Sequence, residues 1–155
     1  PIFKLTKING IGYGAWYYTP LQGYKWLKSS FEIAFAEYLD QHNILWYYEC
    51  KTFPMKIIVD DIEKQTSYTP DFYLPETNEF IDTKGWFKLE SKLKVSKFHE
   101  MFSVYLKILF EQDLINLGIN LKYYTNNKKS KIVNKKEISY ESSLEELIKE
   151  YIKVK

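Results

Sequence analysis

A capping motif joined to a helical stripe fixes the first element of this chain. Ser29 and Glu32 form the pattern S-x-x-E, in which the two side chains accept the free backbone N–H groups of a helix start. Apolar side chains then recur at the spacing of one helix face, at Phe31, Ala34, Phe35, Tyr38 and Leu39. The sequence therefore predicts a helix from Ser29 to His42, with one face buried against other elements.

Four runs of β-branched and aromatic residues follow this helix, and each is typical of a strand. They are Ile44–Glu49, Lys56–Val59, Ser67–Leu74 and Glu79–Lys84. Because proline has no N–H to donate, Pro70 makes the first half of the third run an edge strand or a bulge. Polar turns are predicted at Asp60–Gln65 and Pro75–Asn78.

The sequence patterns of the other segments are less regular. Residues 1–28 are rich in glycine and aromatic residues without periodicity, which predicts an irregular or short-stranded arm. Val104–Phe110 fits a strand, but its apolar residues also fit a prolonged helix. The remaining expected elements are helices at Leu89–Phe102, Gln112–Leu117 and from Ser143, a strand at Leu121–Thr125, and a lysine-rich turn at Asn126–Lys136.

Length and composition restrict the class of protein. A chain of 155 residues predicts one domain, and 45% hydrophobic with 27% charged residues excludes a disordered chain. No run approaches the ~18 apolar residues of a membrane span. Cys50 is the single cysteine, which excludes an intramolecular disulfide and a cysteine-rich zinc site. No secretory pattern opens the sequence, so we expect an intracellular protein, in the cytoplasm of a bacterial host, that is not secreted.

The net charge of +2 hides an uneven distribution. Residues 32–90 carry five lysines against twelve acidic residues, whereas residues 91–136 carry ten lysines against three. An acidic centre with basic flanks is suited to a central cation and a surrounding polyanion. An ordinary solvated surface would give the same pattern.

Two predicted strands around a four-residue turn carry the most informative residues. Asp71 follows Pro70 on the first strand, and Asp82 and Lys84 lie on the second. A short hairpin can bring the two aspartates together, where a hard divalent cation would neutralise them. Asp82 and Lys84 are two residues apart, so on a strand they point to the same face. There Lys84 can orient a water or stabilise charge on a phosphoryl group.

Each of these residues also has a purely structural interpretation. Asp71 fits a turn residue, Asp82 a surface strand residue and Lys84 its ion-pair partner. Glu32 is explained by the capping box alone, and its functional alternative is a further acidic ligand presented by the first helix. The combination of Asp71, Asp82 and Lys84 favours a site over the structural alternative.

Three segments of the sequence, taken in order, resemble the PD-(D/E)xK nuclease superfamily, especially its phage and mobile-element members. They are S29-S-F-E32, Y-T-P70-D71-F-Y-L-P and E-F-I-D82-T-K84-G-W. The resemblance covers about residues 24–118. It implies an α/β fold with a restriction-endonuclease-like mixed sheet, in the order α-β-β-β-α-β, flanked by helices. It also favours a strand at Val104–Phe110. The chain then divides into an N-terminal arm at 1–28, a nuclease core at 29–118, and a basic turn and C-terminal helix at 119–155 within the same domain.

The resemblance also implies roles for individual residues. Asp71 and Asp82 would bind Mg²⁺, or Mn²⁺ in its place, together with the backbone carbonyl of Thr83. Lys84 would position or activate the water, and Glu32 would assist from the first helix, as catalytic group or further metal ligand. The reaction would be hydrolysis of a DNA phosphodiester by an endonuclease of phage or homing type.

Lysines are the expected DNA contacts, because the chain has no arginine for bidentate readout of guanine. The candidates are Lys25, Lys28, Lys92, Lys94, Lys97, Lys128, Lys129 and Lys131. Alternatives are a nuclease that resolves branched DNA such as a Holliday junction or processes DNA ends, and a non-catalytic DNA-binding or assembly module with the same fold. Cleavage of both strands needs two active sites, as in a homodimer, or one site acting twice.

Overall fold

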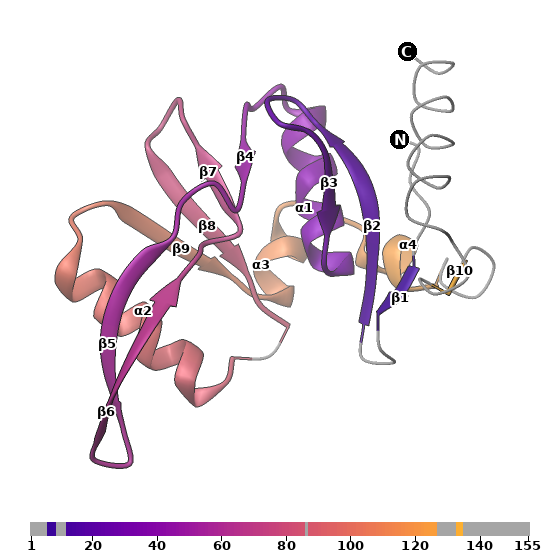
Figure 1. The fold of residues 1–155 in the computed structure, drawn as a ribbon. Helices are drawn as coiled ribbons and strands as arrows, with labels where there is room; N and C mark the ends of the chain where they lie inside the picture. The colour runs from indigo at the N-terminus through magenta and orange to yellow at the C-terminus, as the bar shows by residue number, and fades with distance from the viewer. Residues whose placement is uncertain (1–5, 9–11, 86, 127–132, 135–155) are drawn as a thin grey trace.

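The N-terminal segment forms a sheet of its own. The computed structural model describes residues 6–8, 12–85, 87–126 and 133–134 (Figure 1). β2 (Gly12–Thr19) and β3 (Gly23–Leu27) make an antiparallel hairpin, and β1 (Thr6–Ile8) lies between β2 and β10 (Val133–Asn134). The segment is thus more regular than the sequence predicted. Its alternation was hidden because aromatic residues occupy both faces of the hairpin, Tyr17 on the buried face and its neighbours on the other.

The central sheet is mixed and has the strand order β4-β7-β8-β9. β4 (Tyr47–Tyr48), β7 (Phe72–Leu74) and β8 (Glu79–Thr83) pair antiparallel, and β9 (Tyr105–Leu109) lies parallel to β8. Helix α2 (Leu89–Met101) makes the crossover that a parallel pair requires. The predicted strand at Val104–Phe110 is therefore confirmed.

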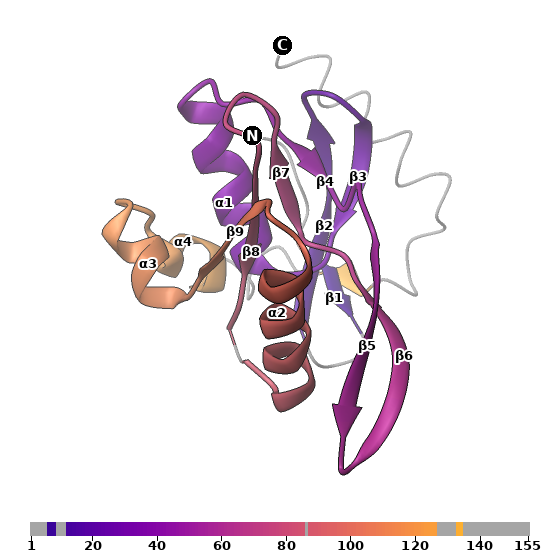
Figure 2. The same ribbon diagram turned by 90° about the vertical axis from the view of Figure 1, so that its left-hand side faces the viewer.

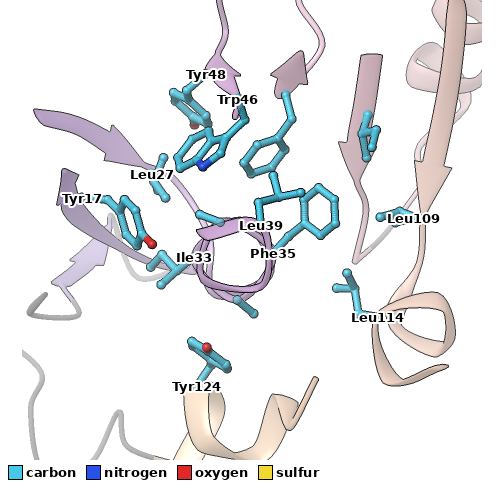
Figure 3. Packing of buried hydrophobic residues seen from close by; sticks show 14 of the residues in the cluster. Tyr17, Leu27, Ile33, Phe35, Leu39, Trp46, Tyr48, Leu109, Leu114 and Tyr124 are labelled. Atoms are coloured by element: carbon cyan, nitrogen blue, oxygen red, sulfur yellow. The ribbon is translucent and has the colours of Figure 1, made fainter. Parts of the chain in front are cut away.

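Helix α1 (Ser30–Gln41) lies between the N-terminal sheet and the central sheet (Figure 1). Figure 3 looks along α1 and shows buried side chains converging on it from several elements. They include Tyr17, Leu27, Trp46, Leu114 and Tyr124. The helix predicted at Ser29–His42 is confirmed, with Ser29 as its N-cap.

A long hairpin is inserted between β4 and β7. Its strands are β5 (Phe53–Val59) and β6 (Ile62–Tyr68), and it extends away from the central sheet beside α2 (Figure 2). Phe53, Met55 and Ile57 bury their side chains in a second core cluster with Phe98 of α2. One face of the central sheet is therefore packed on α1, and the other on α2 and the hairpin.

The hairpin corrects two predictions. A turn was expected at Asp60–Gln65, but it contains only Asp60 and Asp61, because the polar residues that follow belong to β6. They remain exposed, and backbone pairing with β5 defines the strand. The expected strand Ser67–Leu74 is interrupted around Pro70, between the end of β6 and the start of β7.

The segment after α3 (Glu111–Asn116) was also predicted incorrectly. Leu121–Thr125 belongs to helix α4 (Leu121–Asn126) and is not a strand. Leu121 and Tyr124, three residues apart, are both buried, while the two residues between them are exposed. That spacing is helical. Strand β10 lies inside the turn expected at 126–136. Most other residues of that turn, and the whole helix expected from Ser143, lie outside the described residues.

The described chain is thus a mixed α/β structure. Along the central sheet the order is α1, β4, β7, β8, α2, β9, with the β5–β6 hairpin as an insertion. No helix within the described ranges has the length and apolarity to cross a membrane.

Candidate active site

Antiparallel pairing of β7 and β8 sets Asp71 beside Asp82. Phe72 is the register partner of Ile81, so the next residues outward along the two strands are the two aspartates. The Asp71 backbone N–H donates to Asp82 Oδ1 at 2.6 Å, and the Thr83 N–H donates to Asp71 Oδ2 at 3.1 Å. Each carboxylate therefore accepts an N–H from the opposite strand, which fixes both side chains and the alignment of the strands.

Asp82 is almost completely buried, with 1% of its surface exposed. Its Oδ2 accepts the hydroxyl hydrogen of Tyr68, from the end of β6, and Lys84 Nζ lies 3.4 Å from the same oxygen. Burial and the negative charge of Asp82 raise the pKa of Tyr68, so the phenol stays a proton donor. The Lys84 side chain is 24% exposed and so reaches the surface in part.

Glu32 reaches the same region from the first turn of α1. Its backbone N–H donates to Ser29 Oγ at 3.1 Å, and its Oε2 accepts the Lys28 N–H at 2.6 Å. The Tyr48 hydroxyl lies 3.2 Å from both carboxylate oxygens. Glu32 thus caps the helix and also presents a buried carboxyl to the site.

The carboxyls of Glu32 and Asp71 lie within hydrogen-bonding reach of each other. Burial raises the pKa of Asp71 well above its usual range, and the charges of Glu32 and Asp82 raise it further. Burial likewise raises the pKa of Glu32, although the hydrogen bond from the Lys28 N–H opposes the change. Burial is thus the largest cause of both shifts, and like charge adds to it, from Glu49 on Glu32 and from Glu32 and Asp82 on Asp71.

Glu49 joins this group although the sequence did not single it out. It follows β4 with a φ of +45°, and its N–H donates to the Asp71 carbonyl at 2.9 Å. Its Oε2 lies 2.9 Å from Lys28 Nζ, and its charge contributes to the raised pKa of Glu32. Its position at the end of a predicted strand was its only sequence signal.

The candidate DNA-binding lysines are dispersed. Lys28 contacts the site through Glu49, and Lys25 is half-buried in β3. On α2, Lys94 and Lys97 lie 3.9 Å and 3.3 Å from Glu90 and Glu100 of the same helix, and Lys92 lies over the Phe87 ring. Lys128, Lys129 and Lys131 are outside the described residues.

The four acidic side chains do not form a ready metal cage. Among the residues that the structure describes, no three His, Cys, Asp or Glu side chains converge as ligands of one ion. The predicted ligand pair is divided, because Asp71 lies against Glu32 whereas Asp82 accepts hydrogen bonds from Tyr68 and from the Asp71 backbone. The site is therefore a cluster of oxygen donors whose oxygens would need to reorient to share an ion.

Comparison of the chain with family models, with curated proteins and with solved structures gave no match. The function of this site must therefore be inferred from its own chemistry.

Proposed function

We propose that this chain is a metal-dependent DNA endonuclease with a restriction-endonuclease-like core. The observation that carries the proposal is the meeting of three carboxyls, from Glu32, Asp71 and Asp82, with the Lys84 ammonium at one end of the central sheet. The order of α1, β4, β7, β8, α2 and β9 supports it, because it matches the helix and strand order that the sequence resemblance implies.

The charge of the site supports binding of a hard divalent cation. The donors are oxygens, and neighbouring carboxylates add to the burial that raises the pKa values of Glu32 and Asp71, so a bound cation would favour their charged forms. We assign Mg²⁺, or Mn²⁺ in its place, to Asp71 and Asp82 with the Thr83 carbonyl, and Glu32 as a further ligand. When bound, such an ion neutralises phosphate charge and lowers the pKa of water.

Lys84 has the position of a catalytic ammonium. Asp82 holds its side chain on the face of β8 that carries the carboxylate, and its partial exposure leaves Nζ open to a phosphate. In the proposed reaction, water attacks phosphorus, one P–O ester bond breaks, and the proton that the water loses is balanced by one taken up from solvent by the leaving oxygen. Lys84 Nζ would position the water and donate hydrogen bonds to the phosphoryl oxygens on which charge develops.

A cleavage panel tests the proposal. The full chain is incubated with linear duplex, nicked, single-stranded and four-way-junction DNA, in Mg²⁺, in Mn²⁺ and in EDTA. We expect cleavage that requires the metal and disappears in Asp71→Asn. The matched control is Asp61→Asn, an exposed aspartate in the β5–β6 turn, where asparagine tolerates the positive φ of 61°. Preference for the junction or for duplex identifies the DNA substrate.

DNA binding without cleavage in either metal would contradict the nuclease assignment. It would favour the non-catalytic binding module, in which the carboxyl cluster serves only the fold. Cleavage that survives in Asp71→Asn would instead place the active site elsewhere on the chain.

A further inference from the structure

A pocket lies on the side of α1 away from the candidate active site. It has a volume of about 440 Å³, and it opens between α1 and the connection from α3 to α4. Its walls include Glu37, Tyr38, His42, Leu117, Ile119 and Tyr123. Glu37 is five residues beyond Glu32, which turns it about 140° around the helix axis. The two buried glutamates of α1 therefore serve different regions of the molecule.

Glu37 has one satisfied and one unsatisfied oxygen. The Tyr124 hydroxyl donates to Oε2 at 2.8 Å, whereas Oε1 is buried and receives no hydrogen bond within the described part of the chain. The residue is only 5% exposed, and burial raises the pKa of its carboxyl. An unpaired buried acceptor is costly to the fold, so a donor from a bound molecule would relieve that cost. The terminal torsion of a glutamate is soft, so a small rotation can turn Oε1 toward the pocket.

The other groups of the pocket also favour positive charge. The rings of Tyr38 and His42 lie 4.1 Å apart at the carboxyl end of α1, where the helix dipole is negative. The aromatic side chain of Tyr123 is 45% exposed and lines the same pocket. Aromatic faces attract cations. Among the residues that the structure describes, no lysine lines the pocket, which argues against an anionic ligand such as a phosphate.

We propose that this pocket binds an alkylammonium or guanidinium group, with an N–H donated to Glu37 Oε1 and the alkyl body packed against Leu117 and Ile119. Such a group occurs on free polyamines and on lysine or arginine side chains of a protein partner. The site is independent of the proposed nuclease activity, because its residues contact neither Asp71 nor Asp82 in the described contacts.

Titration of the full chain with n-butylammonium and n-butylguanidinium tests the site. Chemical shifts of Gly118 and of the Tyr38 and Tyr123 rings report occupancy by NMR. We expect saturable shifts with both cations, at least tenfold weaker binding of 1-butanol, and weaker binding of tetramethylammonium, which has no N–H. Spermidine and N-acetyl-lysine amide then distinguish the sources, since the natural source should bind more tightly.

Two variants locate the binding. Glu37→Gln keeps the shape and removes the charge, and we expect at least a tenfold loss of affinity for the ammonium. Glu63→Gln, an exposed glutamate of β6, removes the same charge and should leave binding unchanged. If Glu37→Gln does not fold, Tyr123→Leu takes its place. This variant should weaken binding of the cations more than binding of the alcohol. Equal binding of butanol and butylammonium, unchanged affinity in the variant, or no saturable shift would each overturn the proposal.

Discussion

Single hydrogen bonds determine how the acidic residues of the site can be used. The Asp71 N–H, the Tyr68 hydroxyl and Lys84 surround the two oxygens of the buried Asp82. Burial is the main cause that raises the pKa values of Asp71 and Glu32, and neighbouring carboxylates add to it. Within the cluster, therefore, hydrogen bonds hold Asp82 in place, and the Glu32–Asp71 pair has the raised pKa values.

Tyr68→Phe tests the support of Asp82. The change removes a buried donor and leaves one oxygen of a buried carboxylate under-satisfied, so we expect a loss of about 1–3 kcal/mol in the free energy of unfolding. Urea denaturation measures it. Tyr105→Phe, at a tyrosine of β9 that is 56% exposed, is the control and should have little effect. Equal stability of the two variants would contradict the role given to Tyr68.

Lys84→Ala distinguishes a catalytic ammonium from a structural ion pair. We expect DNA binding to remain and the cleavage step to slow by about 10²–10³, since charge develops on the phosphoryl oxygens only during reaction. If the residue is only an ion-pair partner of the buried Asp82, its loss lowers the stability of the fold and leaves cleavage by the folded protein unchanged. Single-turnover rates at saturating protein and Mg²⁺ decide between these outcomes, and a rate within a few-fold of wild type removes Lys84 from the mechanism.

The raised pKa values predict the pH dependence of stability without metal. When a carboxyl has a higher pKa folded than unfolded, the folded state binds more protons, so stability is lost as pH rises through the folded pKa. We expect the wild type in EDTA to become less stable between acidic and neutral pH, through Glu32 and Asp71. Asp71→Asn should flatten this dependence, because asparagine still accepts the Thr83 N–H and carries no charge. Urea denaturation across the pH range measures the slope, and equal slopes would refute the assignment.

At the scale of elements, the start of α1 links the fold to the site. Ser29→Ala removes the acceptor for the Glu32 N–H, so we expect a loss of about 0.5–2 kcal/mol in the free energy of unfolding. Thermal denaturation with Ser30→Ala as control measures it, because Ser30 is inside the helix and does not act as its N-cap. Similar melting temperatures for the two variants would contradict the capping role.

Local patterns in the sequence predicted some elements and not others, for physical reasons. α1 and β8 were predictable because capping, helical spacing and strand composition are local. α4 was missed because Tyr123 and Tyr124 are typical of strands, and only packing of Leu121 and Tyr124 shows the helix. The pairing of Asp71 with Asp82 followed from a short turn, whereas the roles of Tyr68 and Glu49 depend on the insertion of β5 and β6.

At the scale of the whole molecule, charge is distributed unevenly between the site and its surroundings. Four of the twelve acidic residues between positions 32 and 90, Glu32, Glu49, Asp71 and Asp82, lie together at the end of the central sheet, while several lysines lie along α2. If these lysines contact phosphates, they release counterions, and log K for duplex DNA should fall by about 0.9 per contact for each unit of log salt.

Fluorescence anisotropy with labelled duplex at several salt concentrations measures this slope. Lys92→Gln should reduce it by about 1 if that residue contacts a phosphate. Lys56→Gln, on the β5–β6 hairpin and paired with Glu63, is the control. An affinity that does not change with salt would contradict phosphate-led binding.

The crossed hydrogen bonds between Asp71, Asp82 and Thr83 have a consequence for how this protein can change over generations. Each aspartate secures the opposite strand, so, if the proposed nuclease function holds, a descendant without cleavage activity would still need both to keep its sheet aligned. The Lys84 side chain does not join two strands, because it is paired with Asp82 of its own strand and is 24% exposed. In relatives in which catalysis is no longer required, we expect the lysine to be substituted before the two aspartates. Under the proposed function, the residue after the Asp-Thr pair is thus the position that distinguishes active relatives from inactive ones.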